Sequence, residues 1–326
     1  MPAADHAGSF AAMGTVMTVR AHGGPDPLAA CRALVERLED LLSRFRAHSD
    51  VARLHAADGA WTAVHPHTDA VLGRALACAE ATDGAYDPVL GALVELWSVR
   101  ARMTRDLPPV EAADVERARG RCGWHLLERD RAGRYRLAPG ARVDLGGIAK
   151  GYAADRVRDL CADLGARGAL VSFGSSSVAT LGARPDGRPW RVGLRDVHGG
   201  PTAHLASVPL TGSLSTSGDY EQGFVADGRR VHHVLDPRTG RPSASGVRAA
   251  SVVAEDGARA EAWSTAMLVR GAAWAFAACA RTDVEAVLLT DDAVLVSPGL
   301  RGVVRRSRPQ PRARRADASE PSSAAT

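Results

Sequence analysis

The chain has no asparagine, and its 326 residues include one lysine, Lys150, and one isoleucine, Ile148. All its other strongly basic side chains are arginine, a bias typical of a genome that avoids A/T-rich codons. Rarity alone therefore does not indicate function, and the two rare residues can lie close together by chance. The two cations are not equivalent, however, because lysine is a compact point charge and arginine a planar fork. The segment VDLGGIAKGYAAD, which contains both rare residues, is therefore a first candidate for function.

Other scarcities exclude whole classes of protein. The cysteines are scattered and form no C-x-x-C pair, so neither a disulfide framework nor a zinc site is indicated and a reducing compartment fits; they are Cys31, Cys78, Cys122, Cys161 and Cys279. No apolar run approaches the ~18 residues of a membrane span. The first twenty residues do not read as a signal peptide, because no basic start precedes an apolar core. From these absences we expect a cytoplasmic protein without a membrane span.

The net charge of +4 has a local source at the C-terminal end. Residues 305–326 alone carry a formal +4, so residues 1–304 are formally neutral. This segment is rich in arginine, proline and serine and poor in apolar residues, which predicts a disordered tail. The tail could contact nucleic acid or an acidic partner, or have no dedicated role. Because the body is neutral, we expect no nucleic-acid partner.

Residues 1–304 are predicted to form one body with interleaved helices and strands. Apolar periodicity predicts helices that begin at Pro25 or Asp26 and at about His67, and others over residues 89–97, 148–164 and 259–280. Strands are expected over residues 13–19, 141–147, 168–174, 190–196, 247–254, 284–290 and 292–298. Hairpin turns are expected at Ala132-Gly133 and Asp227-Gly228, and the rest of residues 101–140 reads as polar and irregular. The fold class is therefore α+β, with mixed sheets and packed helices.

The segment VDLGGIAKG places an acid, two glycines and Lys150 at the junction of an expected strand and a helix. Glycines let a ligand approach the backbone, and a helix N-terminus favours anions. This outline resembles a phosphate cradle, but neither the Walker spacing nor the G-x-G-x-x-G pattern is present. A glycine turn with a surface lysine is the alternative.

Three further segments carry chemical groups. In VHHVLDPRTGRP, His233 and Asp236 could present a base and an oriented acceptor at the edge of a site, whereas we expect His232 to be an exposed hairpin residue. In AEAWSTAM, Glu261 and Thr265 share one helix face at i and i+4, and their hard oxygens suit Mg²⁺. The segment LSTSGDYEQ offers hydroxyl donors. Taken singly, AEAWSTAM also fits a solvated helix side and LSTSGDYEQ a polar turn.

The order of the motifs is more specific than any one of them. GAYDP, DLGGIAKGYAAD, TSGDY and HHVLDPRTG follow one another along the chain, together with MGT, LSRF and AEAWSTAM. This series resembles the ApbE family of flavin transferases, also called FAD:protein FMN transferases, over about residues 9–298. The resemblance implies an ApbE-like fold in which FAD binds with Mg²⁺ and its pyrophosphate is cleaved. The FMN half then passes to a threonine hydroxyl of an acceptor protein, and AMP is released. Such chemistry needs a metal to neutralise phosphate oxygens and an aligned nucleophile.

The resemblance also implies roles for particular residues. The expected Mg²⁺ ligands are Glu261, Thr265 and the backbone carbonyl of Gly147. The expected FAD contacts are Met13, Phe45, Ala85, Tyr86, Asp87, Asp144, Lys150 and Val234. His233 would be the base toward the acceptor hydroxyl, and Lys150 would act on the pyrophosphate. Ile148 is expected to be core packing under the turn.

Two positions depart from the family pattern. Glu261 stands where the family usually has aspartate, and the longer side chain would need a shifted helix or a water bridge to Mg²⁺. Ser175 follows Gly174 where a glycine pair is usual, so its side chain would crowd a bound ligand. Two alternatives to the transferase therefore stay open: an FAD pyrophosphatase that yields FMN and AMP, and a flavin-binding protein with weakened catalysis.

Overall fold

An eight-stranded sheet forms the centre of the protein. The structure is a computed structural model that describes residues 5–174, 176–197, 203–226 and 229–306, so Ser175 and residues 307–326 lie outside the described part. The strands of the large sheet, in spatial order, are β1 (Asp5–Ala12), β2 (Thr15–His22), β6 (Gly168–Phe173), β7 (Ser177–Gly182), β10 (Gly212–Gly218), β15 (Ala249–Ala254), β16 (Glu285–Leu289) and β17 (Val294–Val296). Every described pairing in this sheet is antiparallel.

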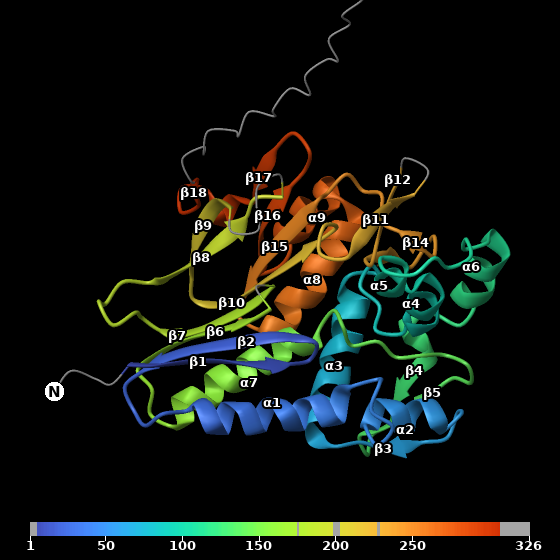
Figure 1. Ribbon diagram of the computed structural model, residues 1–326, viewed down its shortest axis with the longest axis horizontal. Helices are drawn as coiled ribbons and strands as arrows, with labels where there is room; N and C mark the ends of the chain where they lie inside the picture. Colours follow the sequence, from blue (N-terminus) through green and yellow to red (C-terminus); the bar gives the residue numbers. More distant parts are fainter. Residues whose placement is uncertain (1–4, 175, 198–202, 227–228, 307–326) are drawn as a thin grey trace, which may run out of the picture.

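Some helices lie against one face of this sheet and enclose the main core with it, and the others lie beside them (Figure 1). Their bounds are α1 (Leu28–Leu42), α2 (Asp50–Ala56), α3 (Pro66–Ala81), α4 (Gly91–Trp97), α5 (Val99–Arg102), α6 (Ala112–Arg119), α7 (Ala149–Asp163), α8 (Gly257–Arg270) and α9 (Ala272–Cys279). Helix α7 packs on β6 and β7, and α8 packs on β10 and β15. Within the described residues, none of these helices is both long and apolar enough to cross a membrane.

A smaller sheet packs on the opposite face and closes a second core. Its strands are β8 (Trp190–Arg195), β9 (His204–Leu210) and β18 (Arg305–Arg306). The remaining strands form short ladders: β3 (Thr62–Ala63), β4 (Leu127–Arg129) and β5 (Arg134–Leu137); β11 (Gly223–Ala226) and β12 (Arg229–His232); β13 (Leu235–Asp236) and β14 (Arg241–Pro242). The expected α+β combination of helices and sheets is therefore confirmed.

The N-terminal part of the chain is a hairpin, and the prediction of a single strand over residues 13–19 is wrong. Met13 and Gly14 form the two-residue turn between β1 and β2, with φ of 45° and 74°. Two successive positive φ values are what a type I′ hairpin turn requires. A methionine in this conformation is unusual, so the residue types at these two positions did not predict a turn.

Residues 141–147 lead into α7 without forming a strand, contrary to the prediction. Their backbone groups find partners outside a β-ladder: Val143 N donates to His55 Nε2 at 2.9 Å, and Asp144 N donates to Pro88 O at 2.8 Å. Val143 and Leu145 are buried, which gives the segment the apolar spacing of a strand, but no strand of the described residues pairs with it.

The predicted helix over residues 259–280 is two helices, α8 and α9. Gly271 separates them with a φ of 86°, a left-handed conformation that ends α8. Helix α6 was missed because only Val115 and Ala118 of it are buried. The hairpin at Ala132-Gly133 is confirmed by the β4–β5 pairing.

Two further predictions fall partly outside the described residues. Strands β11 and β12 pair as expected, but their turn residues, Asp227 and Gly228, are not described. The division into a body over residues 1–304 and a tail over 305–326 stays a prediction. Arg305 and Arg306 pair with β9, so these two residues extend the small sheet.

Candidate active site

Lys150 and Glu261 form an ion pair between the N-terminus of α7 and the first half of α8. Lys150 Nζ lies 2.5 Å from Glu261 Oε1 and donates to Gly146 O at 3.0 Å. The second carboxylate oxygen, Glu261 Oε2, accepts from Gly151 N at 2.7 Å. Glu261 is only 4% exposed, and a buried carboxylate is tolerated when it is paired and hydrogen-bonded in this way.

Two glycines allow α7 and α8 to approach closely enough for this pair. A Cβ on Gly151 would lie 2.1 Å from Gly257 O, and one on Gly257 would lie 2.7 Å from Gly151 O. The buried Asp155 accepts from Gly257 N at 2.6 Å and from Ser213 Oγ at 2.7 Å, which holds the start of α8 against α7. Burial raises the pKa of Asp155 to about 6. The glycines and Asp155 thus bring Glu261 to the N-terminus of α7.

Gly147, Thr265 and Tyr86 meet beside this pair. A Cβ on Gly147 would lie 3.5 Å from Thr265 Oγ1 and 3.2 Å from Tyr86 Cε2. Thr265 Oγ1 donates to Glu261 O at 3.2 Å and is 3.1 Å from Ser217 Oγ. The structure therefore brings Gly147 next to Thr265, one turn along α8 from Glu261.

Asp144 lies at the edge of the same corner with an exposed aromatic ring nearby. Its Oδ1 accepts from Gly146 N at 2.8 Å, and its Oδ2 lies 3.3 Å from Arg44 Nε. The Arg44 guanidinium lies 4.6 Å from the centre of the Phe45 ring, which is 83% exposed. An exposed ring of this kind can stack on a planar ligand. Sequence reasoning missed Arg44, although it is the immediate neighbour of Phe45 in LSRF.

His233 follows the β11–β12 hairpin directly. Because Gln222 O can only accept, the contact at 3.3 Å makes His233 Nδ1 the donor, and Nε2 of the neutral ring keeps its lone pair. Burial lowers the pKa of His233 to about 4, and the charges of Lys150 and Asp144 act on the same ring. His233 therefore lies close enough to Lys150 and Asp144 for their charges to affect its pKa.

The two neighbours of His233 in its motif have structural roles. His232 is 3% exposed and bonds Ser243 O at 2.9 Å, so the prediction that it is exposed is wrong. Its side chain is turned into the body, where Nδ1 accepts from Val234 N at 3.3 Å. Asp236 pairs with Arg238 at 2.8 Å, so its carboxylate holds the turn and does not orient His233.

The other predicted FAD contacts lie in different environments. Met13 N donates to Glu39 Oε2 at 3.1 Å, which ties the β1–β2 turn to α1. Asp87 is buried and accepts from Val89 N and Trp124 N at 2.7 and 2.9 Å. Burial raises the pKa of Asp87 to about 6. Ala85 and Val234 are also buried, so we expect their contact with a ligand to be made by backbone atoms.

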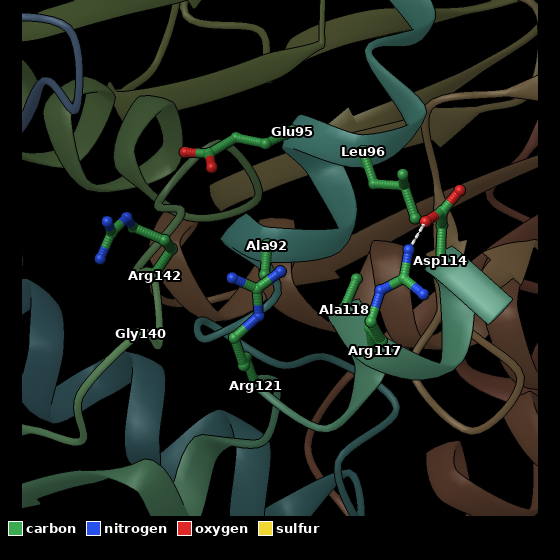
Figure 2. A pocket seen from close by; sticks show the side chains of 9 residues that line it. All are labelled: Ala92, Glu95, Leu96, Asp114, Arg117, Ala118, Arg121, Gly140 and Arg142. Atoms are coloured by element: carbon green, nitrogen blue, oxygen red, sulfur yellow. Dashed lines mark hydrogen bonds and ion pairs between the residues drawn. The ribbon is translucent and has the colours of Figure 1, made fainter. Parts of the chain in front are cut away.

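One cavity of the described structure lies elsewhere. It has a volume of about 360 Å³ and lies between α4, α6 and residues 140–142 (Figure 2). Its charged lining consists of Glu95, Asp114, Arg117, Arg121 and Arg142, and Arg117 points toward Asp114. The cavity includes none of the predicted site residues. We therefore place the candidate active site at the buried Lys150–Glu261 pair and not at this cavity.

Comparison with known proteins decides the family. The model of the ApbE family matches residues 13–288. The chain belongs to the ApbE family. A protein of Klebsiella pneumoniae (strain 342) named FAD:protein FMN transferase is 33% identical over 299 residues, covering 88% of this chain and 90% of that protein. A protein of the same name from Treponema pallidum (strain Nichols) is 35% identical over 255 residues, covering 73% and 69%.

Solved ApbE structures share the fold over nearly the whole chain. The crystal structure of the ApbE protein from Thermotoga maritima has a TM-score of 0.83 at 30% identity and covers 93% of this chain and all of that one. The apo form of the flavinyl transferase ApbE of Pseudomonas stutzeri has a TM-score of 0.82 at 28% identity and covers 93% and 98%. The predicted ApbE-like fold is therefore confirmed.

The donors predicted for Mg²⁺ in this ApbE chain fit a hard cation by their chemistry. They are the buried Glu261 carboxylate, the Thr265 hydroxyl and the carbonyl of Gly147, all of them oxygens, which Mg²⁺ prefers. No group of three or more His, Cys, Asp or Glu side chains suited to a metal occurs in the described part of the chain. A site here therefore depends on one carboxylate supplemented by neutral oxygens. The ammonium of Lys150 beside it suits a ligand that carries phosphate.

Proposed function

We propose that this chain transfers FMN from FAD to a threonine hydroxyl of an acceptor protein in an Mg²⁺-dependent reaction that releases AMP. The observation that carries the proposal is the convergence of Lys150 from α7 with Glu261 and Thr265 from α8 beside Gly147. Membership of the ApbE family, with relatives named FAD:protein FMN transferase, supports it.

The proposed reaction is a phosphoryl transfer in which one bond to phosphorus forms, one breaks and one proton moves. The threonine oxygen forms a bond to the FMN phosphorus, the bond from that phosphorus to the bridging oxygen breaks, and AMP leaves. The hydroxyl proton passes to His233 Nε2, which is unprotonated at neutral pH because burial lowers the pKa of the ring to about 4. The Nδ1–H bond to Gln222 O fixes the tautomer that leaves Nε2 free.

The remaining groups bind and orient the substrate. Lys150 supplies a compact positive charge for the pyrophosphate, and the exposed Phe45 ring supplies a surface for the flavin. Glu261, Thr265 and the Gly147 carbonyl would hold Mg²⁺, which when bound neutralises phosphate oxygens. Asp144, held by Arg44, completes the rim of the site.

The proposal is tested by incubating the purified protein with FAD and Mg²⁺, with and without a candidate acceptor protein. AMP release that requires the acceptor, together with a covalent mass increase of one FMN, is the expected result. AMP and free FMN without acceptor would show the pyrophosphatase alternative, and tight FAD binding without AMP would show a protein with weakened catalysis. The cytoplasmic location expected from the sequence stays a prediction, which fractionation of cells that express the chain would check.

A further inference from the structure

Tyr86 has a buried hydroxyl group without a hydrogen-bond partner among the described residues. The residue is only 3% exposed. Two other tyrosines behave differently: the hydroxyl of Tyr135 donates to Asp69 Oδ1 at 2.8 Å, and that of Tyr152 lies 2.8 Å from His67 Nδ1. Buried polar groups nearly always have a partner, often an ordered water or an ion, so an orphaned hydroxyl points to a bound species.

The hydroxyl end of Tyr86 is the end that approaches the predicted metal site. A Cβ on Gly147 would lie 3.2 Å from Tyr86 Cε2 but 3.7 Å from Cδ2, and Cε2 is bonded to the carbon that carries the hydroxyl. The same Cβ position is 3.5 Å from Thr265 Oγ1. Burial, together with the charges of neighbours that include Glu261, raises the pKa of Tyr86 well above its usual value, so the hydroxyl stays neutral.

We propose that the Tyr86 hydroxyl binds a water molecule in the hydration shell of a divalent cation held by Gly147, Glu261 and Thr265. This inference rests on the proposed function, of which the cation is part. Protein-bound Mg²⁺ usually keeps several waters, and groups that hydrogen-bond such a shell tune the affinity of the site. Both oxygens of Glu261, the one carboxylate among these three ligands, already accept hydrogen bonds from Lys150 and Gly151. A hydroxyl group that binds a water of the cation would therefore strengthen the binding of the cation. Tyr86 is thus a positioning residue for the metal.

The test is the affinity of the whole chain for Mn²⁺, followed by electron paramagnetic resonance without FAD or acceptor. Tyr86→Phe keeps the ring and removes only the oxygen, and it should weaken Mn²⁺ binding about 10-fold. Tyr135→Phe is the matched control: it loses the bond to Asp69 and should bind Mn²⁺ as the wild type does. Equal affinity of the wild type and Tyr86→Phe would overturn the role of Tyr86 alone. A wild type that does not bind Mn²⁺ would overturn the metal in the proposed function as well.

Thermal unfolding in the presence of a chelator separates this role from a merely structural one. Without metal, Tyr86→Phe should unfold at the same temperature as the wild type or above it, because no bond in the protein is lost. Tyr135→Phe should unfold at a lower temperature. If Tyr86→Phe also unfolds at a lower temperature without metal, the hydroxyl has another partner in the folded chain and the inference is wrong.

Discussion

Replacing Gly151 by alanine tests how α7 and α8 bring Lys150 to Glu261. A Cβ at this position would meet backbone atoms only: Gly257 O at 2.1 Å, Gly257 C at 2.5 Å and Ala258 N at 2.9 Å. Ordinary contact begins at 3.4 Å, so the two backbones would have to separate by about 1.3 Å. A side chain could rotate away from such a contact, but backbone at the start of a packed helix cannot.

Two opposing effects determine the size of the change. Alanine favours a helix over glycine by about 1 kcal/mol, whereas overpacking a tight contact costs about 1–3 kcal/mol, with backbone clashes at the upper end. We therefore expect Gly151→Ala to lower the free energy of unfolding by about 2 kcal/mol. The separation of α7 from α8 would also move Lys150 away from Glu261, so FAD turnover should fall.

Gly73 in α3 is the matched control. A Cβ there would have its nearest neighbour, Tyr135 Oη, at 3.8 Å, which is ordinary contact. Gly73→Ala should therefore raise the free energy of unfolding by about 0.5–1 kcal/mol through helix propensity alone. Urea unfolding of both variants at equal slope gives the comparison. A Gly151→Ala protein as stable as the wild type, or shifted in the same direction as Gly73→Ala, would refute the close crossing.

Three further predictions concern the site. Lys150→Arg should lower FAD turnover about 10- to 100-fold, because a planar fork cannot take the place of the ammonium between Gly146 O and Glu261 without displacing them; unchanged AMP release would contradict this. His233→Ala should lower transfer about 100-fold or more. Because burial lowers the pKa of His233 to about 4, the His233 ring followed by NMR should show no titration near pH 6.5, and such a titration would count against the assignment. Glu261→Asp should retain Mg²⁺-dependent turnover. The shorter side chain would no longer reach Gly151 N, so the free energy of unfolding measured in urea should fall by about 1–2 kcal/mol. A large loss of turnover would mean that the site is built around glutamate.

Local periodicity predicted the elements that bury a clear apolar stripe. The buried residues of α1, Cys31, Val35, Leu38 and Leu42, recur at helical spacing, so the sequence revealed this helix and misplaced only its start. Helix α6 offers no such stripe, and the Met13-Gly14 turn lacks the asparagine or aspartate usual in this turn. Residues 141–147 show the converse error. Alternation of apolar and polar residues indicates which side chains are buried, but it cannot show whether another strand pairs with the segment.

The sequence predicted the residues of the candidate site but not the contacts that bring some of them together. The i, i+4 spacing of Glu261 and Thr265 was sufficient to place both on one face of α8. The Gly151–Gly257 crossing and the Arg44–Asp144 pair link segments about 100 residues apart, and no local pattern encodes such a contact. The Tyr86 hydroxyl was inside the predicted GAYD motif, yet only the packing of Gly147 against its ring shows which way it faces.

The structure also gives a reason why the one lysine of an arginine-rich chain survives at position 150. Its Nζ is held at 3.0 Å from Gly146 O and 2.5 Å from Glu261 Oε1, and its side chain is only 24% exposed. A guanidinium would have to satisfy five donors in this space, whereas an ammonium has three and can turn the remaining one toward a phosphate. Ile148, the other rare residue, is fully buried beneath the same turn, and its side chain belongs to the main apolar core. Composition alone does not distinguish the two residues, whereas the polar surroundings of the lysine support its proposed role.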